Sequence, residues 1–509
     1  MKIINSLVLL GLLHLSVTYT TFSQSFDGFA LYNLQNQNTT YLINKDGNIE
    51  HNWSCSVPCN YAVLLKDNGN IVRGGVYPSN QLNGAAIGGL IQEIDPSGNT
   101  VWEFVYSTAD YCSHHDITLL PNGNVILTAW EVKSTAELTQ AGMSNVTSEK
   151  WPTHFIEVQQ DGTGGQIVWE WHIWDHLIQD FDPSKDNYGI VADHPELMDI
   201  NAISGGSGGP GGPGGPGGGD WFHVNGVDYN EELDQLVFSS RFASEIYIID
   251  HSTTTAEAAS HTGGNSGMGG DFIYRWGNPS NYGSSGAQTI AQAVHDPRWI
   301  TNDGRPNGGY IQFFNNQGGS GGTSVVDAIS APENGSIYTM SGSSYGPSNY
   351  DWRHECLVSS NGQSAHNRMS NGNTFVNASG EYMYEVDAND NVVWQYNAGP
   401  AKAFRYECDD PGIIALLGSD PCGALSIDEE KLDVLEFYPN PSTGVFTLDG
   451  IELGENDMTI SVFDISGTKV LELSNSLLID LSEFNDGVYF ARLDFNGENF
   501  VTKKISLVR

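Results

Sequence analysis

Short apolar segments alternate with polar turns from about residue 24 to residue 417. The apolar segments are rich in Val, Ile, Tyr, Phe and Trp, and no long segment with helical periodicity interrupts them. Segments of this kind, separated by Gly, Asn and Asp, are typical of antiparallel strands joined by tight turns. The pattern therefore predicts an all-β domain over residues 24–417.

Two kinds of turn recur along this domain. An acidic turn followed by Val or Ile and then Trp occurs at Asp95–Trp102, Asp161–Trp169 and Asp387–Trp394, and an Asn-Gly-Asn turn occurs at residues 68–70 and 122–124. Asn-Gly and Asp-Gly supply the positive φ angles that tight hairpins need. Repeated four-stranded units with such turns close into a β-propeller, and the span suits six blades with long inserted loops. The recurring Trp residues are interpreted as aromatic residues of the blade cores.

The composition changes after about residue 427. Residues 418–432, with the charged run Asp428-Glu429-Glu430-Lys431, predict a solvated linker, and residues 433–509 hold short strands in which apolar and polar positions alternate. Several short strands over such a length predict a small β-sandwich of the immunoglobulin-like type.

The first 23 residues have the pattern of a signal peptide. Lys2 is followed by the apolar stretch from Leu7 to Leu15, and small residues precede Gln24. The apolar stretch is too short to cross a bilayer, and no later run approaches the roughly 20 residues of a membrane helix. We expect an exported chain that does not span a membrane. Residues 205–219 consist of Gly, Pro and Ser and predict a flexible insert.

The chain has six cysteines, and an even number in an exported protein favours disulfides. The local pairings predicted are Cys55 with Cys59 and Cys408 with Cys422, which leaves Cys112 and Cys356. A zinc site at Cys55 and Cys59 is weaker as an alternative, because no matching pair of ligands follows at a useful spacing.

The formal net charge is −40, from 61 acidic and 21 basic residues. Nucleic acids and anionic membranes are bound through basic surfaces, so this charge argues against both as partners.

Three histidines and one arginine are the candidate catalytic residues. His223 and Arg241 flank a predicted hairpin, which brings them to one end of it, and His115 and His295 stand next to other predicted strands. In a propeller, equivalent strand edges converge at one mouth of the central channel. Three histidines suit zinc, but a guanidinium beside them repels a cation and favours an oxyanion. Each of these residues taken alone also fits a structural role.

Several stretches carry a resemblance to a known family. They are "HHDITLLPNGN", "DWFHVNGVDYN" with "SSR" behind it, "IYRWGNP", and "HDPRWI" with "GGYIQFFNN" behind it. Over most of residues 60–400 the chain resembles the bacterial arylsulfate sulfotransferase family. The resemblance implies a six-bladed propeller that moves a sulfuryl group from a phenolic sulfate ester to a phenol, with no nucleotide donor, cofactor or metal.

The resemblance also implies roles for individual residues. His295 would be the nucleophile that carries the sulfuryl group. His115, His223 and Arg241 would hold the sulfuryl oxygens and assist the departing phenolate. Asn225 and His114, which belong to the same motifs, would contact the substrate.

The C-terminal segment resembles a different family. "YPNPSTGVF", "VFDISGTKV", "DGVYFARL" and the closing "KKISLVR" resemble the C-terminal sorting domain of type IX secretion. This resemblance implies that the type IX machinery exports the chain across an outer membrane to the cell surface or the medium.

Two other functions fit the same sequence. One is a non-catalytic extracellular propeller that binds glycans or proteins, which would tolerate the loss of His295. The other is an aryl sulfate hydrolase, in which water replaces the phenol and sulfate is released without an acceptor.

Overall fold

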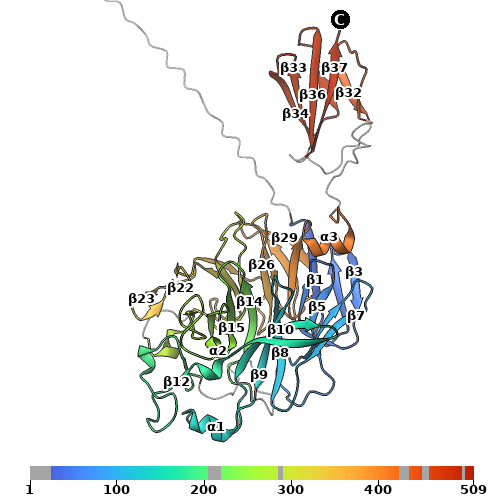
Figure 1. Cartoon of the computed structure of the whole chain (residues 1–509). Coiled ribbons are helices and arrows are strands. Elements are labelled where there is room, and N and C mark those ends of the chain that lie inside the picture. Colours follow the sequence, from blue (N-terminus) through green and yellow to red (C-terminus); the bar gives the residue numbers. More distant parts are fainter. Residues whose placement is uncertain (1–24, 204–218, 285–289, 423–434, 450–457, 496–498) are drawn as a thin grey trace, which may run out of the picture. The chain divides into compact units, whose positions relative to one another are not determined.

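The computed structural model describes residues 25–203, 219–284, 290–422, 435–449, 458–495 and 499–509. The chain divides into two compact units, residues 1–419 and residues 420–509 (Figure 1). The predicted signal peptide lies outside the described residues, as do most of the Gly/Pro insert and most of the linker.

Six four-stranded antiparallel sheets make up the described part of the first unit. Written from the inner edge outwards, the first sheet holds β30 (Ala403–Glu407), β1 (Gly28–Asn33), β2 (Thr39–Ile43) and β3 (Ile49–Ser54), and the second holds β4 (Cys59–Leu65), β5 (Ile71–Val76), β6 (Gly89–Ile94) and β7 (Thr100–Val105). The third sheet holds β8 (Tyr111–Leu119), β9 (Val125–Glu131), β10 (Thr153–Asp161) and β11 (Gly164–His172), and the fourth holds β14 (Val224–Asn230), β15 (Gln235–Ser240), β16 (Glu245–Asp250) and β17 (Tyr274–Trp276). The fifth sheet holds β18 (Val294–Trp299), β19 (Ile311–Asn315), β20 (Val325–Ile329) and β25 (Trp352–Glu355), and the sixth holds β26 (Ala365–Arg368), β27 (Thr374–Asn377), β28 (Met383–Val386) and β29 (Val392–Tyr396).

The inner strands of these sheets form a closed circuit. β4 contacts β8, β8 contacts β14, β14 contacts β18, β18 contacts β26, β26 contacts β30, and β30 contacts β4. The sheet that closes the circuit combines three N-terminal strands with the C-terminal strand β30, which pairs with β1. The all-β prediction is confirmed, and we interpret the circuit of sheets as a propeller.

The recurring Trp residues join neighbouring sheets. Trp102 on β7 donates its Nε1–H to the carbonyl oxygen of Gly164, in the outer turn of the next sheet, at 2.6 Å. Trp169 on β11 donates in the same way to Thr253 Oγ1 at 3.2 Å, and Trp394 on β29 donates to the carbonyl oxygen of Lys45. These hydrogen bonds satisfy the indole N–H groups and fix the outer strands β7, β11 and β29 to a turn or loop of the following sheet.

The acidic turns have the geometry that their sequence predicts. In the turn between β6 and β7, the Asp95 carboxylate accepts the backbone N–H groups of Ser97 and Asn99, and Gly98 has a φ of 84°. A side chain that satisfies the backbone of its own turn, together with a Gly at positive φ, specifies a tight hairpin. This explains why the sequence of the turn predicts the strand boundaries.

Short elements decorate the sheets. The helices are α1 (Thr135–Gln140), α2 (Thr255–Ala258) and α3 (Pro411–Leu417), with single 3₁₀ turns η1 (Ile173–Asp175), η2 (Val191–Asp193) and η3 (Pro279–Tyr282); the two-stranded pairs are β12 (Leu177–Ile178) with β13 (Met198–Asp199), β21 (Glu333–Asn334) with β22 (Ile337–Tyr338), and β23 (Met340–Ser341) with β24 (Ser344–Tyr345). Among the described residues, no helix has the length and apolar character that a membrane crossing requires.

The second unit consists of two sheets around one apolar core. One sheet holds β31 (Glu436–Tyr438), β32 (Val445–Asp449) and β35 (Leu478–Asp480), and the other holds β33 (Met458–Asp464), β34 (Lys469–Ser474), β36 (Gly487–Phe495) and β37 (Asn499–Leu507). Phe446 and Ile479 from the first sheet share a core with Ile460 and Leu493 from the second. Two sheets that share a core form the predicted sandwich.

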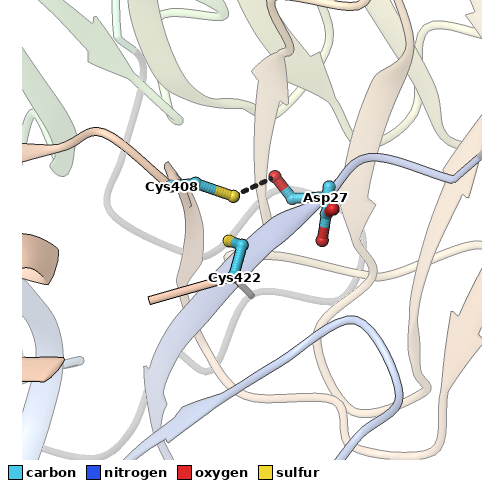
Figure 2. Close-up of side chains that lie close together, drawn as sticks. All are labelled: Asp27, Cys408 and Cys422. Atoms are coloured by element: carbon cyan, nitrogen blue, oxygen red, sulfur yellow. Dashed lines mark hydrogen bonds between the residues drawn. The ribbon is translucent and has the colours of Figure 1, made fainter. Parts of the chain in front are cut away.

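The cysteines confirm one predicted disulfide and contradict the other. Cys408 and Cys422 are disulfide-bonded, and the carbonyl oxygen of Asp27 lies 3.0 Å from Cys408 Sγ (Figure 2). Cys55 and Cys59 are free thiols, so the prediction that they pair is wrong. Cys55 follows strand β3 while Cys59 begins strand β4 of the next sheet, and their thiols donate to the carbonyl oxygens of different residues.

Candidate functional site

The predicted catalytic histidines belong to three inner strands: His115 lies in the middle of β8, His223 directly precedes β14, and His295 is the second residue of β18. Each of these strands has a shift of register against its neighbour, between Ser113 and Ile117, Val224 and Gly226, and His295 and Arg298. His115 and His223 have positive φ angles of 49° and 55°. Such backbone is strained in residues other than Gly, at about 1–3 kcal/mol each, and bulges of this kind are common beside active sites. The bulges turn the histidines towards one cavity.

The cavity has a volume of about 340 Å³. His115, His223, Arg241 and His295 all line it, so the structure brings together the four residues predicted to be catalytic. The remaining lining residues are Tyr61, Ala85, Ser359, Ser360, Asn361, Gly362, Gln363, Ser379 and Glu381.

His295 is held through one ring nitrogen. Its Nδ1 lies 2.8 Å from the carbonyl oxygen of Ala293 and 2.6 Å from Asn316 Oδ1. Asn316 Nδ2 donates to the carbonyl oxygens of Ser360 and Gln363, which leaves Oδ1 as the acceptor towards His295. Because both contacts of Nδ1 are acceptors, Nδ1 carries the proton and Nε2 carries the lone pair.

Burial and charge keep His295 neutral. Its side chain is buried, and burial followed by the neighbouring Arg241 and His223 holds its pKa well below the usual value. A neutral imidazole with a free lone pair is a nucleophile at ambient pH.

His223 is paired with a buried carboxylate. Its Nδ1–H donates to Asp220 Oδ2 at 2.5 Å, and its backbone N–H donates to Asp220 Oδ1 at 3.0 Å. Burial acts to raise the pKa of Asp220, but the neighbouring His223 outweighs burial and lowers it. An ionised carboxylate on Nδ1 stabilises the protonated ring and leaves Nε2 for proton transfer.

His115 forms a pair with His114. Their Nδ1 atoms lie 2.7 Å apart, and the His114 ring stacks on Trp130 with a centroid separation of 4.1 Å. Burial lowers the pKa of His114 to about 3, and burial with the neighbouring His223 holds the pKa of His115 well below its usual value. Both rings are therefore neutral at ambient pH, and a neutral imidazole can take part in hydrogen bonds.

Arg241 supplies the positive charge of the cavity. Within the described residues its guanidinium forms no ion pair, although only 9% of the residue is exposed. A Cβ atom added to Gly362 would lie 2.9 Å from Arg241 Nη1 and 3.7 Å from His295 Cε1, so Gly362 leaves room for both groups. A buried guanidinium without a carboxylate is suited to an anionic ligand.

Tyr61 forms part of the wall beside His115. Its ring contacts the His115 ring with a centroid separation of 5.5 Å, and Gln35 and Gln363 donate to its hydroxyl oxygen. Burial raises the pKa of Tyr61 to about 12, so the hydroxyl stays protonated and can act as a donor towards the cavity. No sequence pattern indicated this residue.

A buried ion network lies under the histidines. Asp116 and Asp296 directly follow His115 and His295, and the ammonium group of Lys402 lies 2.6 Å from Asp116 Oδ2 and 2.8 Å from Asp296 Oδ1. All three are buried, and Arg298 Nε lies 3.2 Å from Asp296 Oδ1, so two cations compensate the two carboxylates. Lys402 thereby fixes the two His-Asp segments relative to each other.

Asn225 and His114, expected to contact substrate, do not line the cavity. Asn225 Nδ2 donates to the carbonyl oxygen of Val294, and its Oδ1 accepts from Ser239 Oγ. His114 lies behind His115. Direct contact of either residue with substrate stays a prediction, and in this structure both support the wall.

Comparison with known families identifies two segments. A family model described as arylsulfotransferase (ASST) matches residues 17–331, and one described as a secretion system C-terminal sorting domain matches residues 436–508. The sorting domain indicates export to the cell surface or secretion. None of the curated proteins matches the sequence.

The solved structures that match this chain are distant in sequence. A protein of unknown function from Bacteroides caccae is 11% identical, with a TM-score of 0.41, 74% of this chain and 98% of that chain covered. BamB from Moraxella catarrhalis is 10% identical (TM-score 0.32, coverage 76% and 93%), and apo AztD from Citrobacter koseri is 8% identical (TM-score 0.34, coverage 75% and 99%). Similarity at this level bears on neither activity nor substrate.

Proposed function

Because the chain belongs to the arylsulfotransferase family, we propose that it transfers a sulfuryl group from a phenolic sulfate ester to a phenol through a sulfohistidine at His295. The observation that carries this proposal is the hydrogen bonding of His295, which protonates Nδ1 and leaves a lone pair on Nε2 in a cavity that also contains Arg241. Family membership supports arylsulfotransferase activity in general.

In the first half-reaction, His295 Nε2 attacks the sulfur atom of the donor. The N–S bond forms while the bond between sulfur and the aryl oxygen breaks, and the bonding pair leaves on the phenolate oxygen. Sulfation gives the imidazole ring a positive charge. The acceptors on Nδ1, Ala293 O and Asn316 Oδ1, stabilise that charge.

His223 serves as the acid and base. As the donor ester breaks, the Nε2–H of protonated His223 transfers its proton to the phenolate oxygen, and Asp220 stabilises the charged ring beforehand. In the second half-reaction, His223 takes the proton of the acceptor phenol while the phenol oxygen attacks sulfur. The S–N bond then breaks, the pair returns to Nε2, and His295 and His223 regain their starting states.

During transfer, the sulfuryl group needs fixed hydrogen-bond donors more than further acid–base chemistry. Like a transferring phosphoryl group, it is planar, with negative charge spread over three oxygens. Arg241, His115 and Tyr61 line the cavity beside His295 and offer a guanidinium, an imidazole and a protonated hydroxyl to these oxygens. Donors placed before the reaction stabilise such charge without reorganisation.

One assay distinguishes the three candidate functions, which are sulfuryl transfer, sulfate ester hydrolysis and non-catalytic binding. The purified chain is incubated with 4-nitrophenyl sulfate, with and without added phenol, and nitrophenolate, phenyl sulfate and inorganic sulfate are measured. We expect nitrophenolate and phenyl sulfate to appear together and to depend on phenol. Sulfate released equally well without phenol would indicate a hydrolase, and no turnover of any aryl sulfate would favour the binding propeller.

The partners follow from the two units. The propeller unit takes a small aryl sulfate donor and a phenolic acceptor, with no cofactor. The sorting domain at residues 436–508 is the segment that the type IX secretion machinery would engage.

A further inference from the structure

A second cluster of polar side chains lies outside the catalytic cavity. It consists of His176, which follows η1, and His261 and Asp271, which stand at the two ends of a Gly-rich loop before β17. One ring nitrogen of each histidine and a carboxylate oxygen of Asp271 lie within 4.8 Å of one another. The cluster therefore joins the segment after β11 to a loop of the following sheet.

One carboxylate oxygen serves both histidines. Asp271 Oδ1 lies 2.7 Å from His176 Nδ1 and 2.8 Å from His261 Nδ1. The other ring nitrogen of His176, Nε2, lies 2.8 Å from the carbonyl oxygen of Ala258. His176 thus faces an acceptor at each nitrogen, whereas a neutral imidazole has only one N–H. One of its two contacts is repulsive unless a cation lies at the ring.

A metal ion at Nδ1 removes this conflict. The Nε2–H then donates to Ala258 O, which is the usual arrangement for a histidine that binds a metal through its other nitrogen. The His176 ring is fully buried and stacks on Trp171 at an interplanar angle of 5°. Trp171 Nε1 donates to the carbonyl oxygen of Gly270, the residue before Asp271, so two of the ligands are held rigidly.

We propose that His176, His261 and Asp271 bind one Zn²⁺ ion. Two imidazoles and a carboxylate suit a borderline ion such as zinc, whereas Ca²⁺ and Mg²⁺ prefer oxygen ligands alone. Zn–N and Zn–O bonds of about 2.0–2.2 Å require the histidine–carboxylate separations to widen by about half an ångström. The His261 side chain is 61% exposed, so a water molecule can complete a tetrahedron. The ion would clamp the Gly-rich loop to the preceding sheet.

Zinc binding to the full chain tests the proposal. Untagged protein is stripped with EDTA, dialysed and titrated with ZnCl₂ by isothermal calorimetry, and its melting temperature is measured with and without zinc. We expect one tight Zn²⁺ per chain and a higher melting temperature, with no such effect of CaCl₂. His261→Ala, which changes an exposed side chain, should weaken binding at least about tenfold and remove the rise in melting temperature.

His194→Ala is the matched control. His194 is also exposed and contacts a carboxylate, Glu196, but it lies outside the cluster. Its variant should bind zinc as the natural chain does. If His261→Ala binds zinc as tightly as the natural chain, or if the stripped protein neither binds zinc nor gains stability from it, the proposal is wrong.

Discussion

Asn316 Oδ1 lies 2.6 Å from His295 Nδ1, and the Asn316 amide nitrogen donates to the carbonyl oxygens of Ser360 and Gln363. The amide is therefore fixed at both ends. It holds the imidazole in the tautomer that the proposed attack requires and accepts more strongly once the ring becomes charged. Asn316 is in this account a positioning residue for the nucleophile.

Asn316→Ala should reduce turnover far more than substrate binding. A hydrogen bond to a charged group is worth about 1.5–3 kcal/mol, so kcat should fall roughly 10- to 150-fold while KM for the donor changes little. Steady-state kinetics with 4-nitrophenyl sulfate and phenol measure both quantities. Asn302→Ala, at an exposed position outside the cavity, serves as the control. An unchanged kcat in the Asn316 variant would remove this residue from the mechanism.

Arg241→Lys should fail even though the charge is kept. An ammonium cannot reproduce the two-pronged contact of a guanidinium with sulfuryl oxygens, and we expect a loss of about 2–4 kcal/mol of transition-state stabilisation. The quantity to compare is kcat/KM for the donor. Arg305→Lys is the matched variant, because Arg305 pairs with Asp303 outside the cavity. Equal losses in the two variants would show that the effect is not specific to the site.

The convergence of the four candidate residues on one cavity could be predicted from the sequence better than the surroundings of that cavity. The motifs place His115, His223 and His295 next to strands. Because the inner strands of a propeller converge, the three histidines are then expected at one site. Asn316 could have been found, because Asn315 pairs with Val294 across the hairpin and places Asn316 beside His295. Asn225 lies two residues after His223, which suggests a common face, but the bulge between Val224 and Gly226 separates them.

Other features depend on closure of the circuit of sheets, which no local pattern encodes. Lys402 and the loop from Ser359 to Gln363 reach the site from the end of the propeller sequence. The strand boundaries, by contrast, follow from local turn chemistry, as at Asp95 and Gly98. The predicted disulfide between Cys55 and Cys59 is wrong because closeness in sequence does not orient two side chains that belong to different sheets.

His251 should make stability depend on pH on the alkaline side. Burial acts to lower its pKa, but Asp234 at 2.8 Å and Glu157 at 3.1 Å raise it to about 9. Because the folded pKa exceeds the unfolded value of about 6.5, the stabilisation is complete below that value and is lost as the pH rises through about 9. This pKa shift corresponds to a contribution of at most about 3 kcal/mol to the free energy of unfolding. Solvent screening at the partly exposed Asp234 reduces that contribution.

The measurement is the melting temperature of the natural chain and of His251→Gln across this pH range. The difference between the two should shrink as the pH increases from about 6.5 to about 9. A difference that stays constant over the range would show that the charge of His251 does not contribute.

The thiol content of the unfolded protein should report one disulfide. The free cysteines are Cys55, Cys59, Cys112 and Cys356, so unfolding in denaturant without reductant should expose four reactive thiols per chain. A thiol reagent such as DTNB counts them, and prior reduction should raise the count by the two from Cys408 and Cys422. A count of two before reduction would indicate that Cys55 and Cys59 are paired after all.

The sulfohistidine at His295 is the central claim, and mass spectrometry of the enzyme after a single turnover tests it most directly. The natural chain and His295→Asn are each mixed with excess 4-nitrophenyl sulfate in the absence of phenol, quenched and digested under mildly alkaline conditions. The account predicts a burst of nitrophenolate equal to the enzyme concentration and one SO₃ group on the peptide that contains His295. The group should disappear when phenol is added, and His295→Asn should show neither burst nor modification. A normal burst from His295→Asn, or sulfation of a different residue, would contradict the account.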